Sequence, residues 1–224
     1  MTRKSPNKKL FQAARTGSVE NAQAALDAGA NIKAKDDEGN TPLHCAAGEG
    51  QTEVAQLLIK KGANLSAEGD YDETPLHQAV RHGHTEVAGL LIEQGADVNA
   101  RCTQEYTPLH YAVKKGCVDA VRLLIGNGAK VNARGTTGYT PLHFAAECGH
   151  AGIARLLIEH GADINAKTIE RERTALALAT CNSQRENIAD IGHFDIIDLL
   201  KATPLQSHAA RVEQSRGTGK REIG

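Results

Sequence analysis

Apolar residues recur along this chain in blocks spaced 33 positions apart, and each block lies between two glycines. Within one block, Val54, Leu57 and Leu58 have the spacing of residues on one face of a helix. Gly62 follows, and a glycine there commonly ends a helix because it readily adopts a positive φ. The pattern predicts a helix over residues 52–60. The repeated apolar triplets are Leu57–Ile59, Leu90–Ile92, Leu123–Ile125 and Leu156–Ile158.

A polar-to-apolar boundary precedes each block and has the sequence Thr-Pro-Leu-His. It begins at Thr41, Thr74, Thr107 and Thr140. A threonine oxygen can cap a helix, and proline suits the first helical position because its missing N–H would be unpaired there. A second glycine, such as Gly50, follows nine residues after each threonine. The boundary therefore predicts a short first helix over residues 42–49, ahead of the helix over residues 52–60.

A fixed period of this length is typical of stacked-repeat proteins, in which each unit buries its apolar side chains against its neighbours. Four copies of Thr-Pro-Leu-His, in register with both glycines, resemble the ankyrin repeat, and the resemblance covers residues 8–203. It implies an all-α solenoid of stacked helix-turn-helix units with protruding β-hairpin loops. Helices of about ten residues are marginal alone in water, so the units must stabilise one another.

The repeat pattern makes one elongated domain between two polar segments. Residues 8–35 are expected to form an N-terminal cap, since Lys8 and Lys9 stand where Thr and Pro are expected and the outer helix is more polar. Residues 1–7 are predicted to be disordered and residues 204–224 to form a flexible tail. The predicted internal repeats are residues 36–68, 69–101, 102–134 and 135–167, and residues 168–203 are the predicted C-terminal cap.

Two departures from the period predict local differences. Asp72 and Glu105 stand where the other internal loops have Gly39 and Gly138, so these two loops must turn without the permissive residue. The last unit begins at Thr174, and an insertion of nine residues is predicted around residues 182–191. The final amphipathic helix after it is expected to have Phe194, Ile197, Leu199 and Leu200 as its apolar positions.

The evenly spaced histidines of the Thr-Pro-Leu-His motif could suggest a row of metal ligands. No carboxylate or thiol recurs beside them at ligand spacing. The resemblance implies instead that each histidine bridges its threonine and neighbouring backbone. We therefore interpret them as structural and expect no metal and no cofactor.

Composition limits the class of partner and the cellular compartment. The formal net charge is −1, which favours neither nucleic acid nor a membrane surface as the partner. Five cysteines without a Cys-x-x-Cys pair, and no secretory signal, indicate a reducing compartment, so a cytoplasmic location is expected. There are three Phe, four Tyr and no Trp, which suits a stack built on Leu, Ala and Gly.

Three fragments could suggest chemistry, and none forms a convincing site. Residues 217–220 contain a glycine-lysine pair but lack the strand and helix that a phosphate-binding loop needs. His82 and His84 could hold a metal ion, but they flank a glycine that ends a helix. Cys148 could act as a nucleophile beside His150, but no oriented base and no oxyanion site accompany them. We therefore expect no enzymatic activity.

The resemblance implies that partners contact the loop residues before each threonine and the two residues before the first glycine. These positions are acidic in the second unit and locally basic in the fourth, where Lys114 and Lys115 stand. Tyr106 and Tyr139 occupy equivalent loop positions and are expected to face solvent. Tyr111 and Phe144 follow the motif histidines and either join this surface or only pack between helices. The predicted partner-binding residues are Tyr71, Arg81, Tyr106, Tyr111, Lys114, Lys115, Tyr139 and Phe144.

The sequence thus predicts a monomeric protein–protein interaction module, acting as an adaptor, scaffold or inhibitor. Its partner is another protein, with no nucleic acid and no membrane. The alternative is a regulatory or targeting subunit of an enzyme whose chemistry lies in the partner.

Overall fold

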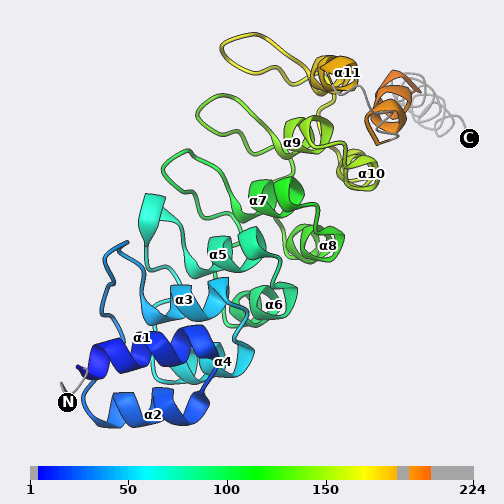
Figure 1. Ribbon diagram of the computed structural model, residues 1–224. Helices are drawn as coiled ribbons and strands as arrows, with labels where there is room; N and C mark the ends of the chain where they lie inside the picture. Colours follow the sequence, from blue (N-terminus) through cyan, green and yellow to red (C-terminus); the bar gives the residue numbers. More distant parts are fainter. Residues whose placement is uncertain (1–4, 186–191, 203–224) are drawn as a thin grey trace, which may run out of the picture.

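The chain forms a curved stack of helix pairs (Figure 1). The structure, a computed structural model, describes residues 5–185 and 192–202. The inner helices are α1 (Pro6–Thr16), α3 (Pro42–Gly48), α5 (Pro75–His82), α7 (Pro108–Lys115), α9 (Pro141–Glu147) and α11 (Ala175–Arg185). The outer row consists of α2 (Val19–Asp27), α4 (Thr52–Lys60), α6 (Thr85–Glu93), α8 (Val118–Gly126), α10 (Ala151–Glu159) and a helix over residues 192–202. Each inner helix packs on the inner helices of the adjacent units, which confirms the predicted all-α repeat solenoid.

The motif histidine explains why the inner helices α3, α5, α7 and α9 begin where they do. The Thr41 amide donates to Nδ1 of His44 at 3.1 Å, and the Thr41 hydroxyl lies 2.8 Å from the same atom. An amide can only donate, so Nδ1 is the acceptor and the neutral ring carries its proton on Nε2. Nε2 then donates to the carbonyl oxygen of Glu73 in the next unit at 2.9 Å. The structural interpretation of the histidines is confirmed, and each also links two units.

The other three histidines repeat this link. Their Nε2 atoms lie 3.2, 3.3 and 3.0 Å from carbonyl oxygens of the next unit. The pairs are His77 with Tyr106, His110 with Tyr139 and His143 with Arg173.

The core is a double row of leucines and alanines between the two helix layers. Leu76, Leu109 and Leu124 are among the fully buried side chains. Truncating such a leucine to alanine typically costs about 2–5 kcal/mol, which is much of a domain's stability. The apolar period of the sequence therefore corresponds to the packing that stabilises the stack.

The connecting loops project from the inner row as hairpin-shaped turns, and no strand is assigned within residues 5–185 and 192–202. In the second unit, the Asp36 amide donates to the Asn40 carbonyl and the Gly39 amide to the Asp36 carbonyl. Glu105 has φ 61°, close to the 79° of Gly39, so the fourth loop keeps the left-handed turn without glycine. The third loop also keeps it, at Asp72 with φ 58°, and adds a second left-handed residue, Tyr71 with φ 55°, within η1 (Asp70–Asp72).

The structure differs from the predicted boundaries and apolar positions at both ends of the stack. Helix α1 begins at Pro6, with Ser5 accepting a hydrogen bond from the Lys8 amide, so residues 5–7 are not disordered and the cap begins before residue 8. In the last helix Phe194 is 52% exposed whereas Ile196 is buried, so Phe194 does not belong to its apolar face. Residues 1–4, 186–191 and 203–224, which include most of the predicted insertion and the tail, lie outside the described residues.

Membrane crossing requires a long apolar helix. No helix among the residues that the structure describes is both long and apolar enough to cross a membrane.

Candidate functional site

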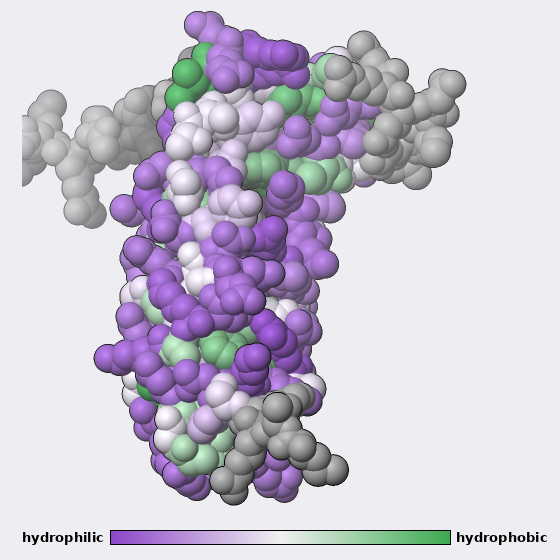
Figure 2. Space-filling model, turned by 60° about the vertical axis from the view of Figure 1, so that its left-hand side comes forward, coloured by the Kyte–Doolittle hydropathy of each residue, from purple (hydrophilic) through white to green (hydrophobic). Residues whose placement is uncertain are grey.

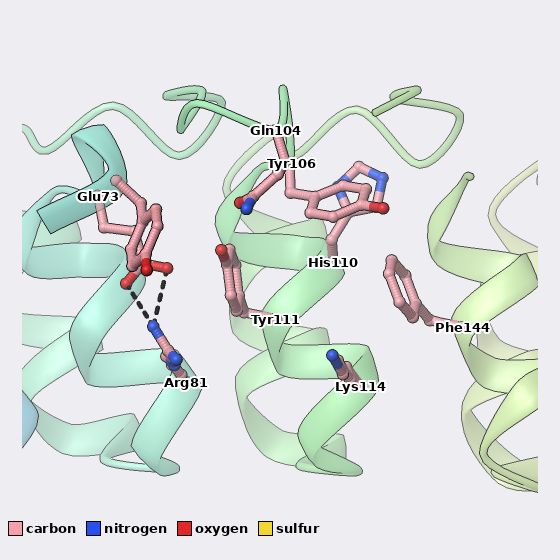
Figure 3. A pocket seen from close by; sticks show the side chains of 9 residues that line it. Glu73, Arg81, Gln104, Tyr106, His110, Tyr111, Lys114 and Phe144 are labelled. Atoms are coloured by element: carbon pink, nitrogen blue, oxygen red, sulfur yellow. Dashed lines mark hydrogen bonds and ion pairs between the residues drawn. The ribbon is translucent and has the colours of Figure 1, made fainter. Parts of the chain in front are cut away.

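A hollow of about 520 Å³ opens on the surface formed by the inner helices and the loops, which we call the inner face (Figure 3). It spans three consecutive units, from the third to the fifth. Side chains of α5, α7 and α9 form its floor, and loop residues form its upper wall. Its lining residues are Tyr71, Glu73, Arg81, Gln104, Tyr106, His110, Tyr111, Lys114 and Phe144.

Two repeat positions supply most of the aromatic rings. The residue after the motif histidine is Tyr111 in the fourth unit and Phe144 in the fifth, and the residue before the threonine is Tyr106 or Tyr139. Stacking places these positions side by side on neighbouring helices. The Tyr106 and Phe144 ring centroids are 5.2 Å apart, and so are those of Tyr139 and Phe144. These distances are typical of interacting aromatic pairs, so the four rings form one cluster.

Two cations lie over rings of this cluster. The guanidinium carbon of Arg81 is 5.8 Å from the Tyr111 centroid, and the ammonium nitrogen of Lys114 is 5.6 Å from the Phe144 centroid. Arg81 and Lys114 occupy equivalent positions on α5 and α7, near the ends of these helices. Cation–π contacts within about 6 Å stabilise such an arrangement, more so where water is excluded.

A buried carboxylate holds one of these cations. Glu73 is 1% exposed, and Nη1 of Arg81 donates to both of its carboxylate oxygens at 3.0 Å. Nε2 of Gln78 donates to the same carboxylate at 2.9 Å. A buried carboxylate without partners would cost several kcal/mol, so these bonds fix Arg81 while they stabilise Glu73.

Burial controls the ionisation of the remaining groups. It raises the pKa of the Tyr111 phenol, and the nearby Glu73 carboxylate and Cys102 thiol raise it further. Burial likewise raises the pKa of Tyr139. Both phenols are therefore neutral at neutral pH and able to donate hydrogen bonds. The charges at the hollow come from Glu73, Arg81 and Lys114.

Six of the eight predicted residues line the hollow: Tyr71, Arg81, Tyr106, Tyr111, Lys114 and Phe144. Tyr139 contacts Phe144 from the neighbouring unit without lining it, and Lys115 is exposed beyond the lining. The expectation that the loop tyrosines face solvent is wrong, because Tyr106 and Tyr139 are half-buried. Their rings pack on the motif histidines, at 5.1 Å from His110 and 5.5 Å from His143.

Three lining residues are absent from the eight predicted partner-binding residues: Glu73 and Gln104, which stand at loop positions expected to contact partners, and His110. Glu73 stands at the loop position that carries tyrosine in the next two units, and Arg81 follows it by eight residues. An acidic residue immediately before the Thr-Pro-Leu-His motif was the available signal. Its burial, however, depends on how the loop folds onto α5.

The other candidate chemistry gains no support. The His82 and His84 rings are stacked at 6.5 Å, and Nε2 of His84 bonds to the Gly48 carbonyl. No group of three or more His, Cys, Asp or Glu side chains that could hold a metal ion occurs in the described part of the chain. Burial raises the pKa of Cys148, which makes its thiol a weaker nucleophile. Residues 217–220 lie outside the described residues.

Comparison with known proteins agrees with this architecture. A family model described as ankyrin repeats (3 copies) matches residues 10–102, 67–135, 99–168 and 135–202. In the comparison with curated proteins, none matched the chain. Together the matched segments span nearly all of the stacked units, with the capped inner helices and the histidine links between units, and the chain therefore belongs to the ankyrin-repeat family.

Proposed function

We propose that this chain is a protein-binding module, acting as an adaptor, scaffold or inhibitor, and that its partner binds the inner face at the third to fifth units. Ankyrin repeats generally mediate protein–protein interactions and are typically not enzymes, which supports the general role. The observation that carries the specific proposal is the hollow, where clustered aromatic rings lie beside Arg81 and Lys114. Buried aromatic and arginine side chains are enriched at interface hot spots.

The surroundings of the hollow support the same location. Figure 2 shows a mostly hydrophilic surface on the loop side of the molecule, with only small apolar areas. Tyr71 is 57% exposed at the mouth of the hollow, on the loop that contains η1. An exposed ring beside partly buried ones offers apolar contact area without a large exposed apolar patch, which suits a partner that binds reversibly.

The test is affinity capture with quantitative mass spectrometry, comparing the parent chain with two variants. Lys114→Glu reverses an exposed charge at the hollow, and Lys60→Glu makes the matched change at an exposed lysine of the outer helix α4. The proposal expects a set of proteins that the parent and Lys60→Glu capture and Lys114→Glu loses. If all three capture the same proteins, the inner face at these units is not the binding site.

The same experiment distinguishes the roles. Capture of one enzyme at fixed stoichiometry would favour a regulatory or targeting subunit, and capture of several unrelated proteins would favour a scaffold. The proposal also takes the chain to be a monomer in a reducing compartment. The five free cysteines fit that compartment, and sedimentation should give one species near 23.8 kDa.

A further inference from the structure

Arg81 and Lys114 are equivalent residues of adjacent units, and each lies over an aromatic ring of the following unit. Arg81 covers Tyr111, and Lys114 covers Phe144. The two cations therefore form a regular row across α5 and α7. Cations spaced by one unit of the stack can bind a ligand whose negative charges have the same spacing.

Both cations have hydrogen-bonding capacity left for a partner. Arg81 uses Nη1 for Glu73, and within residues 5–185 and 192–202 its Nη2 and Nε have no hydrogen-bond partner. Among the residues that the structure describes, the side chains of Lys114 and its exposed neighbour Lys115 form no ion pair and no hydrogen bond. An ammonium and an arginine with unused donors are the groups that bind carboxylates and phosphates.

The carboxylates near the cations mostly have partners. Glu73 is paired with Arg81, and Asp72 accepts a hydrogen bond from the Thr103 hydroxyl at 2.9 Å. Glu105 is paired with Arg101. Asp70 and Glu147 lie outside the lining of the hollow, so the hollow itself carries one negative and two positive charges. Its lining therefore has a net charge of +1, which a bound carboxylate can balance at Lys114.

We propose that the partner presents an acidic segment in the extended polyproline II conformation, with carboxylates three residues apart that bind Arg81 and Lys114 in turn. This inference rests on the proposed function, because it names what occupies the same hollow. Packed helices lie about 8–10 Å apart. A polyproline II segment has three residues per turn and rises about 3.1 Å per residue, so residues i and i+3 face the same way about 9 Å apart.

The aromatic floor favours this conformation. Proline-rich segments bind grooves lined by aromatic side chains, and Tyr106, Tyr111 and Phe144 line this one. In a β-strand, residues i and i+3 point to opposite sides, and residues i and i+2 are only about 7 Å apart. A strand therefore fits the row of cations less well.

Nucleic acid is a poorer match to the same charges. The whole chain has a formal net charge of −1. The second unit adjoins the third on the side away from α7, and its exposed acidic residues Asp37 and Glu38 would repel a continuous phosphate backbone. A short acidic peptide spans only the positive stretch.

The test begins with a displayed library of random 12-residue peptides selected against the full chain, followed by synthesis of the selected consensus. Three fluorescent peptides serve as defined probes: one containing Glu-Pro-Leu-Glu, one containing Gln-Pro-Leu-Gln, and one in which Glu-Glu-Pro-Leu changes the spacing at constant composition. The inference expects acidic pairs at i and i+3 in the selected peptides. It also expects the first probe to bind at least tenfold more tightly than the other two.

The variants test the location. Lys114→Glu should abolish binding of the first probe, whereas Lys60→Glu should leave it unchanged. Removing Arg81 alone would leave the buried Glu73 carboxylate without its cation. The role of Arg81 is therefore tested in the double variant Glu73→Gln/Arg81→Gln. This double variant should lose about tenfold in affinity, and circular dichroism should show that it is folded.

The other outcomes overturn the inference in distinguishable ways. Selected peptides that are neutral or basic, yet lost on Lys114→Glu, would refute the acidic segment and keep the inner face as the binding site. Selected peptides that bind Lys114→Glu as tightly as the parent would refute both proposals. Acidic pairs at i and i+7 would mean a helical partner. If a 12-nucleotide single strand or inorganic phosphate binds as tightly as the first probe, the hollow is a general anion site. A library that yields no binders also contradicts the inference.

Discussion

Nη1 of Arg81 lies 3.0 Å from both carboxylate oxygens of Glu73, and Glu73 is almost completely buried whereas the Arg81 side chain is about half-exposed. The pair is therefore asymmetric. A surface arginine neutralises a carboxylate that lies inside the loop packing, and the same guanidinium covers the Tyr111 ring. Stability and the proposed binding surface are coupled at this one side chain.

The first prediction follows from this pair. Arg81→Leu leaves the Glu73 carboxylate buried without its cation, with Gln78 and the Tyr111 phenol as neutral side-chain partners, and should lower the free energy of unfolding by about 1–3 kcal/mol. The measurement is urea denaturation followed by circular dichroism. Glu73→Gln/Arg81→Leu is the control, because it removes the charge along with its partner and should recover most of the loss. Equal destabilisation of the single and double variants would show that the pair is not energetically coupled.

The second prediction concerns acid. Burial lowers the pKa of His77 and of His110 to about 4, against an ordinary value of 6.5. Above pH 6.5 the two histidines are neutral in both the folded and the unfolded chain, so the protein has its full stability there. As the pH falls from 6.5 to 4 only the unfolded chain takes up the protons, and each residue should cost about 3 kcal/mol. Burial also lowers the pKa of His44 and His143, which adds to the effect.

Denaturation at a series of pH values from 7.5 to 4 measures this dependence. The parent should lose stability steeply below pH 6.5, and His110→Gln should show a shallower slope although it is less stable at pH 7.5. A parent whose stability is constant between pH 7 and 5 would contradict the buried neutral histidines.

The third prediction is a stabilising substitution. Asn99 and Asn132 each bind two backbone groups of the next unit: Asn99 donates to the Gly128 carbonyl at 3.1 Å and accepts from the Lys130 amide at 2.8 Å. Asn132 makes the equivalent pair of bonds. Ser66 occupies this position in the second unit, and its side chain is too short to reach across.

Ser66→Asn should therefore add an inter-unit connection of about 1 kcal/mol and raise Tm by about 2–4 °C. Differential scanning calorimetry measures the change, with Ser66→Ala as the matched control that adds no hydrogen bond. Asn132→Ser should shift Tm in the opposite direction. If Ser66→Asn and Ser66→Ala melt at the same temperature, the asparagine bonds contribute nothing measurable.

The fourth prediction corrects the expectation for a loop tyrosine. Because the Tyr106 ring packs on His110 and Phe144, Tyr106→Ala should cost about 1–3 kcal/mol of stability, in addition to any effect on binding. Tyr106→Phe keeps the ring and loses only the hydroxyl contact with Thr137 at 3.3 Å, so its stability should stay within about 1 kcal/mol of the parent. Thermal melts of both variants test this, and an unaffected Tyr106→Ala would mean that the ring is not part of the packing.

The fold was largely predictable because its signals are local and repeated. Thr41, Pro42 and Gly50 each act within one turn of backbone, and four copies in register leave little ambiguity. The terminal units were less predictable because no neighbouring unit constrains them on the outer side. At the N-terminal end, Ser5 and Pro6 start the helix two residues ahead of the predicted boundary at residue 8.

The candidate site was partly predictable for a related reason. Period alone brings Tyr111 and Phe144 onto neighbouring helices, where both rings contact Tyr106, so this part of the cluster follows from the spacing. The burial of Glu73 does not, because it depends on the path of a loop with a left-handed residue at Tyr71. Whether a loop tyrosine faces solvent or packs on the adjacent ring also depends on that three-dimensional path.

The histidine links have a consequence for how such a chain can evolve. The third, fourth and fifth units each carry one donor ring and one acceptor carbonyl, so duplication or deletion of such a unit keeps the hydrogen bonds between units complete. The acceptor is always main chain, and the residues that provide it here are as different as Glu73, Tyr106, Tyr139 and Arg173. Mutation can therefore change the side chain at every joint, and with it the molecule that is recognised, while the connection between units is inherited unaltered.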